Sequence, residues 1–244
     1  METFLAFVAI GFVAQMIDGS IGMAYGLVST SSLIAVGMPP ASASAAVHLA
    51  EVFTTGASGA AHWRQGNVDR ALLRRLAIPG AVGGLIGAAL VSSVPTPTIR
   101  IVANIYLLLM GLVVLAKAFD RRPREPNHRH IGKLAFVGAL IDAFGGGWGP
   151  VVTSTLIAKG HEPRRTVGSV NLTEFVVTLS QSAMFFALLG VTHVDVVAAL
   201  VVGGILAAPL AARLTGRLPV RLLIVLVGGT VAALSARSLY LAFA

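Results

Sequence analysis

Long apolar stretches separated by short polar spacers set the pattern of this chain. Eight apolar runs can be read along it, at residues 4–37, 41–61, 71–94, 99–118, 134–158, 166–190, 194–212 and 218–243. A helix that crosses a hydrocarbon core of ~30 Å needs about 20 apolar residues, and most of these runs have that length. Ten-residue segments of alternating polarity are absent. The pattern therefore predicts an all-α polytopic membrane protein, with helices and not barrel strands crossing the bilayer.

Two of the runs, the first and the fifth, are interrupted by glycine-rich patches. These patches cover residues 18–26 (DGSIGMAYG) and 142–150 (DAFGGGWGP). Glycine weakens a helix, and Pro150 removes a backbone donor from it. We therefore predict that each of these two segments is a broken helix that turns back as a hairpin.

The two patches belong to an internal repeat with an offset of 123 residues. Residues 22–52 match residues 145–175 at 13 of 31 aligned positions, against about three or four expected from shared apolar composition. Identical pairs include Gly22 with Gly145, and Glu51 with Glu174. The repeat predicts two homologous halves, residues 1–118 and 133–244, joined by a basic linker at 119–132.

Composition and charge exclude several classes of protein. Hydrophobic residues make up 56% of the chain and charged residues only 11%, against about 25% charged in soluble domains. Cysteine is absent, which rules out disulfides and cysteine-based metal sites. The net charge of +8 does not indicate nucleic-acid binding, because the basic residues are confined to the spacers between apolar runs.

The basic residues predict the orientation of each half. Sixteen of the 18 fall into four clusters, and only Arg100 and Arg237 lie elsewhere. The clusters are Arg64, Arg70, Arg74 and Arg75; Lys117, Arg121, Arg122, Arg124, Arg129 and Lys133; Lys159, Arg164 and Arg165; and Arg213, Arg217 and Arg221. The positive-inside rule places all four in the cytoplasm. The second hairpin must then enter and leave on the cytoplasmic side, whereas the first opens to the outside. Each half becomes a hairpin plus three transmembrane helices, and the two halves are inverted relative to each other, as in many secondary transporters.

Acidic residues within the apolar runs are the first candidates for chemistry. Glu51 and Glu174 lie about ten residues into their helices, at equivalent positions of the repeat, where a charge costs about 2.5–3.5 kcal/mol. A desolvated carboxylate takes up a proton more readily, so we interpret both as proton-coupling residues, together with Asp18 and Asp142 beside the patches. A structural hydrogen bond between helices is the alternative for each.

The glycine-rich patches are the second candidate. Backbone N–H groups at the start of each second arm suit an anion. His48 lies three residues before Glu51, and Asn171 lies three before Glu174, so each pair shares a helix face. The predicted substrate-binding residues are Gly22, Met23, Ala24, Tyr25, Gly26, Thr30, His48, Gly146, Gly147, Trp148, Gly149, Thr153 and Asn171. Close helix packing is the alternative role for the glycines.

Three motifs, in this order and spacing, resemble the TauE/SafE sulfite-exporter family, also called the toluene-sulfonate uptake permease family. They are the loop 59–69, which contains His62 and the run Gly66-Asn67-Val68-Asp69; the helix with small residues from Gly80 to Gly87; and the patch from Gly145 to Pro150. The resemblance covers nearly the whole chain. It implies a carrier of sulfite, sulfonates or related sulfur anions in the bacterial inner membrane.

Together these features predict a proton-coupled secondary transporter of a small sulfur-containing anion, multi-pass in the inner membrane, with most basic loops cytoplasmic. Its expected partners are the anion, protons and the lipid bilayer; small-residue faces permit a homodimer. No cofactor, resident metal, nucleic acid or enzymatic activity is expected. The alternatives are a divalent-cation carrier that uses His48 and the intramembrane carboxylates, a channel, and a membrane enzyme or receptor.

Overall fold

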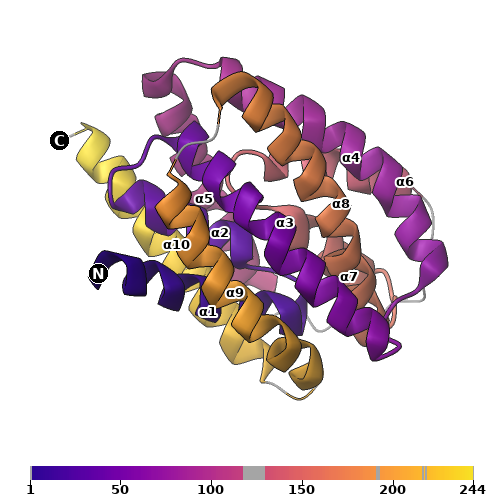
Figure 1. Ribbon diagram of the computed structural model, residues 1–244. Coiled ribbons are helices and arrows are strands. Elements are labelled where there is room, and N and C mark those ends of the chain that lie inside the picture. Colours follow the sequence, from indigo (N-terminus) through magenta and orange to yellow (C-terminus); the bar gives the residue numbers. More distant parts are fainter. Residues whose placement is uncertain (1, 118–129, 191–192, 216, 218, 244) are drawn as a thin grey trace.

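The computed structural model describes residues 2–117, 130–190, 193–215, 217 and 219–243, and the regular elements among these residues are all helices. Residues 118–129, most of the predicted basic linker, lie outside the described part of the chain. The elements are α1 (Glu2–Ile21), α2 (Tyr25–Ala35), α3 (Pro40–Arg64), α4 (Arg70–Ser93), α5 (Thr96–Lys117), α6 (Ile131–Asp142), the π-helical segment η1 (Gly149–Thr153), α7 (Ser154–Ala158), α8 (Pro163–Leu189), α9 (Val194–Leu214) and α10 (Val220–Phe243). Figure 1 shows them gathered into one elongated bundle.

Six helices in the described residues are long and apolar enough to cross a membrane, which confirms the all-α polytopic class. They are α1, α4, α5, α8, α9 and α10. Helix α3 has 25 residues but is not among them, because its buried side carries histidine, glutamate, threonine and serine. The two first arms also differ: α1 has 20 residues and is long enough to span the bilayer alone, whereas α6 has 12.

Helices from the two halves of the sequence pack against each other in reciprocal pairs. Helix α1 packs on α9 and α6 packs on α4, while α3 pairs with α8 and α5 pairs with α10. The closest approaches occur at glycine. A Cβ at Gly83 would lie 2.2 Å from the carbonyl oxygen of Phe136, and one at Gly203 would lie 2.0 Å from that of Val8. The glycines of α4 and α9 therefore let backbones of opposite halves touch.

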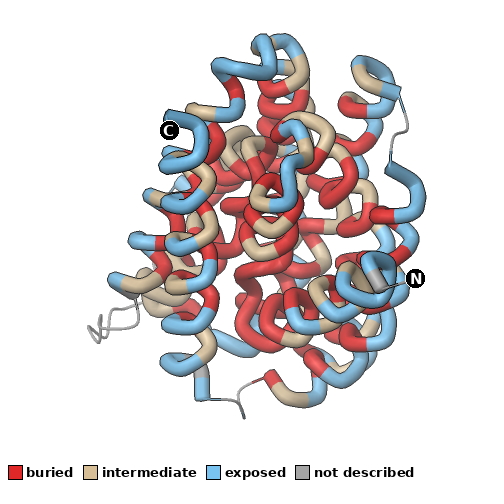
Figure 2. Tube along the Cα trace, turned by 90° about the vertical axis from the view of Figure 1, so that its left-hand side faces the viewer, coloured by how far each residue is buried: buried red, intermediate tan, exposed pale blue. Residues whose placement is uncertain are grey.

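Apolar side chains cover the outside of the bundle, and polar ones fill much of its centre. Ile78, Leu109, Leu206 and Leu226 are each more than half exposed. Figure 2 shows the buried positions along the middle of the bundle, with exposed ones on the periphery. This distribution suits a lipid environment, in which helices need no apolar core to associate.

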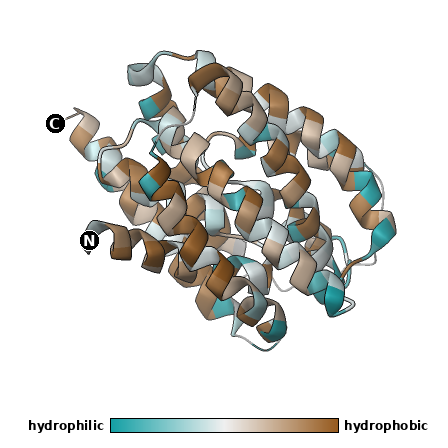
Figure 3. Ribbon diagram, viewed as in Figure 1, coloured by the Kyte–Doolittle hydropathy of each residue, from teal (hydrophilic) through white to brown (hydrophobic). Residues whose placement is uncertain are grey.

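The basic residues of the α3–α4 loop and of the start of α8 lie at one end of the bundle, the lower right in Figures 1 and 3. The α3–α4 loop meets the start of α8 there, where the backbone N–H of Asp69 donates to the Ser169 hydroxyl at 2.7 Å. Nearby, the Thr215 hydroxyl donates to the carbonyl of Gly19 at 3.2 Å. The turns at 36–39 and 94–95 lie at the opposite end.

Candidate functional site

Both glycine-rich patches interrupt their helices, as predicted. Helix α1 stops at Ile21 and α2 starts at Tyr25, with φ of 72° at Gly22 and 142° at Ala24. Helix α6 stops at Asp142 and η1 starts at Gly149, with φ of 132° at Gly145 and 98° at Gly146. We call residues 22–24 the first break and residues 143–148 the second break. A π-helical turn follows the second break, a form that is frequent at functional sites.

The two breaks cross each other in direct contact in the centre of the bundle. Thr153 lies against Gly22 and donates its hydroxyl to the Gly22 carbonyl at 2.7 Å. The repeat-equivalent residues pack in the same way, because Thr30 lies against Gly145.

A second set of contacts is likewise reciprocal. The backbones of Gly26 and Gly146 touch, and so do those of Gly149 and Met23. Position 146 is the repeat equivalent of position 23, and 149 that of 26. The crossing therefore relates the two breaks by an approximate two-fold exchange.

Asp142 occupies the backbone donors of the second break. Its Oδ1 accepts from the N–H groups of Gly147 at 2.7 Å and Trp148 at 2.8 Å. Its Oδ2 lies 3.2 Å from Nε2 of His48 and accepts from Nε2 of Gln181 at 3.1 Å. In this conformation the donors that the sequence assigned to an incoming anion are held by the chain's own carboxylate.

His48 connects Asp142 to Glu51. Its Nε2 lies 4.0 Å from the Glu51 carboxylate, and its Nδ1 lies 2.7 Å from the carbonyl of Ser44, one turn earlier. The ring of Phe185 packs against the imidazole at a centroid distance of 5.7 Å. The imidazole, in its protonated form, is the cation closest to this pair of carboxylates.

Four carboxylates share the buried centre: Asp18, Glu51, Asp142 and Glu174, each no more than 5% exposed. They lie close enough to repel one another, and Glu174 is repelled most strongly by Asp18. No Lys or Arg of the described residues is buried. Four negative charges beside one histidine are not sustainable in a low-dielectric interior, so protons or cations must neutralise part of them.

The remaining predicted substrate residues lie around the crossing but differ in what they contact. The indole of Trp148 is fully buried, packs against Gly80 and donates to the carbonyl of Val170 at 3.3 Å. The Tyr25 hydroxyl donates to the carbonyl of Leu200 at 3.1 Å. Both side chains thus pack in the bundle interior, whereas the backbone N–H groups of Tyr25 and Trp148 face the charged centre, at Asp18 and Asp142.

The polar side chains of Thr30 and Asn171 belong to the site itself, unlike those of Tyr25 and Trp148. The Thr30 hydroxyl is buried with no partner among the described residues. The Asn171 side chain accepts a hydrogen bond from Ser58 at 2.8 Å. These two groups, with His48 and the four carboxylates, form the polar part of the site.

Several polar residues of the site were missed from the sequence: Gln15, Thr54, Ser58, Tyr106 and Gln181. Tyr106 donates its hydroxyl to the carbonyl of Gly146 at 2.7 Å and so fixes the second break. For three of the others, the spacing in the sequence could have indicated their place in the site. Gln15 precedes Asp18 by three residues, and Ser58 and Gln181 follow Glu51 and Glu174 by seven, which places each on the same helix face as a buried acid.

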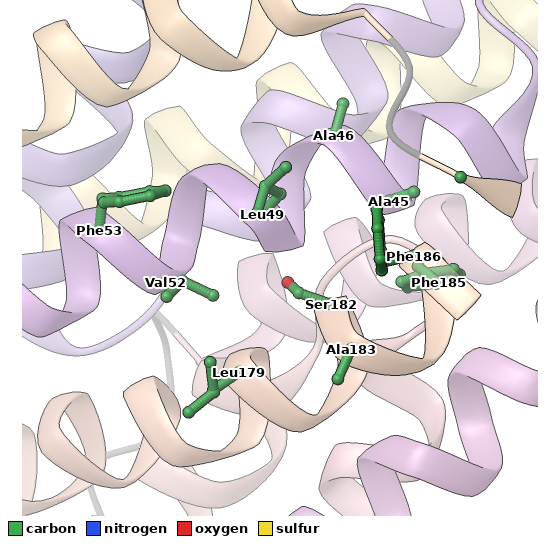
Figure 4. A pocket seen from close by; sticks show the side chains of 11 residues that line it. Ala45, Ala46, Leu49, Val52, Phe53, Leu179, Ser182, Ala183, Phe185 and Phe186 are labelled. Carbon is green, nitrogen blue, oxygen red and sulfur yellow. The ribbon is translucent and has the colours of Figure 1, made fainter. Parts of the chain in front are cut away.

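An apolar groove of about 340 Å³ runs between the outer parts of α3 and α8. Figure 4 shows Leu49 and Phe53 on one side, Leu179 on the other, and the Ser182 hydroxyl pointing between the helices. Phe185 lines the groove and also contacts His48. One aromatic ring therefore separates the groove from the charged centre.

The fold and the site define a multi-pass helical membrane protein with broken helices that cross around buried ionisable groups. The family model for the sulfite exporter TauE/SafE matches residues 7–238. The chain belongs to the TauE/SafE family of membrane transporters, and it is not an enzyme.

A curated relative supports this assignment. The chain is 42% identical over 250 aligned positions to the Bacillus subtilis (strain 168) protein named "Probable membrane transporter protein YtnM". The match covers 98% of the chain and 83% of the relative. No solved structure matches the fold.

Proposed function

We propose that this transporter moves a small sulfur-containing anion, such as sulfite or an organosulfonate, across the inner membrane together with protons. The observation that carries the proposal is the group of four buried carboxylates beside the crossed breaks, with His48 as its basic partner. Protonation of Glu51 or Glu174 lowers the negative charge that an anion meets in the centre. Uptake of a proton and of an anion then favour each other.

The breaks supply the donors for the anion in this proposal. Gly147 and Trp148 direct two N–H groups at Asp142, and the Thr30 hydroxyl is buried without a partner. An anion that reaches the second break competes with Asp142 for those N–H groups. A proton on the Asp142 carboxyl weakens its hold and opens the donors to the substrate.

We further propose that residues 1–118 and 133–244 are inverted repeats that rock against each other for alternating access. Support comes from the reciprocal contacts between the breaks and the reciprocal packing of α1 on α9 and α6 on α4. In an inverted repeat, a contact that one element of the first half makes with the second half recurs with the two halves exchanged. Alternating access follows when the two halves exchange their conformations around a fixed central site.

Transport itself is tested by counterflow in proteoliposomes. Vesicles loaded with unlabelled sulfite should accumulate external radiolabelled sulfite several-fold above empty vesicles, and a proton gradient should increase the flux. A carrier shows this acceleration and a channel does not. Equal uptake by loaded and empty vesicles, for sulfite and for organosulfonates alike, would overturn the anion-carrier proposal.

The divalent-cation alternative gains no support from the geometry. Within the described residues, no group of three or more His, Asp or Glu is placed to hold a metal ion together. His48 pairs with Asp142 and Glu51 instead.

Orientation is tested with single cysteines, since the chain has none of its own. Val36 and Arg164 are exposed at opposite ends of the bundle. We expect Val36→Cys to react with a membrane-impermeant maleimide in intact cells, and Arg164→Cys to react only after the membrane is opened. Labelling of both from the same side would contradict the proposed topology of the second hairpin.

A further inference from the structure

Asp18 and Asp142 occupy corresponding places in the two halves but differ in how they are satisfied. Each lies in the last turn of the helix that precedes a break, and each is at most 3% exposed. Asp142 has contacts with two backbone N–H groups, His48 and Gln181. Asp18 accepts from the backbone N–H of Tyr25, but its Oδ2 has no partner among the described residues.

The charge of Asp18, like that of Asp142, is unfavourably placed with respect to the helix that carries it. It sits at the C-terminal end of a 20-residue helix, where the helix dipole carries partial negative charge and favours cations. The last turn of α1 contains no basic residue. The charges of Asp142 and Glu174, which act on Asp18 across the centre, have the same sign as its own. This end of α1 therefore lacks a positive charge.

Two further buried side chains, one on α1 and one on α3, carry oxygens with no hydrogen-bond partner among the described residues. Gln15 is fully buried, neither its Oε1 nor its Nε2 has a partner, and it shares the helix face of Asp18 three residues away. That face meets α3 at Ser58, because a Cβ on Gly19 would lie 3.2 Å from the Gln15 amide nitrogen and 3.4 Å from the Ser58 hydroxyl. Thr54, one turn before Ser58, has a buried hydroxyl beside that of Tyr25, and the Tyr25 hydroxyl already donates to the carbonyl of Leu200.

We propose that the C-terminal end of α1 binds a monovalent cation of the size of Na⁺, held by Gln15 Oε1, Asp18 Oδ2 and Thr54 Oγ1. Hard cations take oxygen ligands, and broken helices coordinate Na⁺ through the carbonyl end of a half-helix. One carboxylate with two neutral oxygens suits a single positive charge. Buried polar atoms left unpaired destabilise a protein, and a bound cation would satisfy them.

The site makes the two breaks complementary. On the Asp142 side a histidine neutralises the carboxylate, and on the Asp18 side the cation does so. The bound cation also reduces the repulsion between Asp18 and Glu174. Its effect on anion transport rests on the proposed function, whereas its binding does not.

Thermal unfolding of the purified protein tests the site, with the fluorescence of Trp63 and Trp148 as the signal. NaCl is titrated against choline chloride at constant ionic strength and pH 8, with KCl as a size control. We expect the melting midpoint to rise by about 5 °C at saturating Na⁺ and clearly less with K⁺. Equal midpoints in Na⁺ and choline, or in Na⁺ and K⁺, overturn the proposal.

Adjacent threonines of α3 provide a matched pair of variants. Thr54→Val removes the proposed ligand hydroxyl, while Thr55→Val removes one that donates to the carbonyl of Glu51 at 2.5 Å. The Na⁺ concentration for half of the shift should rise at least tenfold in Thr54→Val and stay within twofold in Thr55→Val. Equal responses of the two variants contradict the assigned ligands. Counterflow plays no part in this readout, so a failed anion-carrier proposal would leave the result unchanged.

Discussion

Alanine in place of Gly146 is expected to destroy the crossing of the two breaks. Its Cβ would lie 2.3 Å from the backbone nitrogen of Leu27 and 2.4 Å from the carbonyl carbon of Gly26. Backbone atoms of α2 cannot move aside without displacing the first break. The residue also has φ of 98°, which is strained for any side chain. Overpacking and strain together should cost on the order of 3–5 kcal/mol.

The readouts are the yield of monodisperse protein in detergent and the melting midpoint. Gly37→Ala is the matched control, since Gly37 has φ of 102° but no atom within 4 Å of the added Cβ. Strain alone should then cost about 1–2 kcal/mol. If both variants melt within 2 °C of the parent, the breaks are not packed as described.

Glutamine in place of Glu51 or of Glu174 is expected to reduce proton-driven transport at least a hundredfold while counterflow continues. Glutamine keeps the size and hydrogen-bonding capacity of the side chain but cannot take up or release a proton. Both carboxylates are buried, at 2% and 5% exposure, among three other acids. Removing one negative charge relieves repulsion, so the variants should remain folded.

Proteoliposomes with an imposed pH gradient measure the effect, and counterflow without a gradient measures the carrier step alone. Glu162→Gln is the control, because Glu162 caps α8 at the exposed end of the bundle and glutamine keeps an acceptor for the N–H of Arg164. It should transport like the parent. Full proton coupling in both Glu51→Gln and Glu174→Gln would refute the role given to these carboxylates.

The distribution of apolar runs predicted the elements well, because hydrocarbon leaves the backbone few alternatives to the helix. The interruptions at Gly22 and Gly146 were visible for the same reason, since glycine clusters and Pro150 weaken helices locally. Asp69 caps α4 in the same local way: its side chain accepts from the N–H groups of Ala71 and Leu72. These are local properties, which residues close in sequence decide.

The partners of each side chain depended on contacts between distant residues. Trp148 was assigned to substrate, yet its indole fills the space left by Gly80 of α4. The N–H groups of Gly147 and Trp148 were assigned to an anion, yet Asp142 holds them. Gln15 looked unremarkable until packing showed that its carboxamide is buried without a partner.

The sequence by itself determined the membrane class, the approximate extents of the apolar helices, the family and the presence of rare acids in apolar runs, because burial in lipid penalises every exception to the apolar pattern. Only the tertiary structure decided that the two breaks cross at glycine, that Asp142 is satisfied and that Asp18 is not. Those outcomes depend on where two backbones can come into contact. Such contacts are made by pairs of residues that are distant in sequence, such as Gly26 and Gly146, which are 120 residues apart.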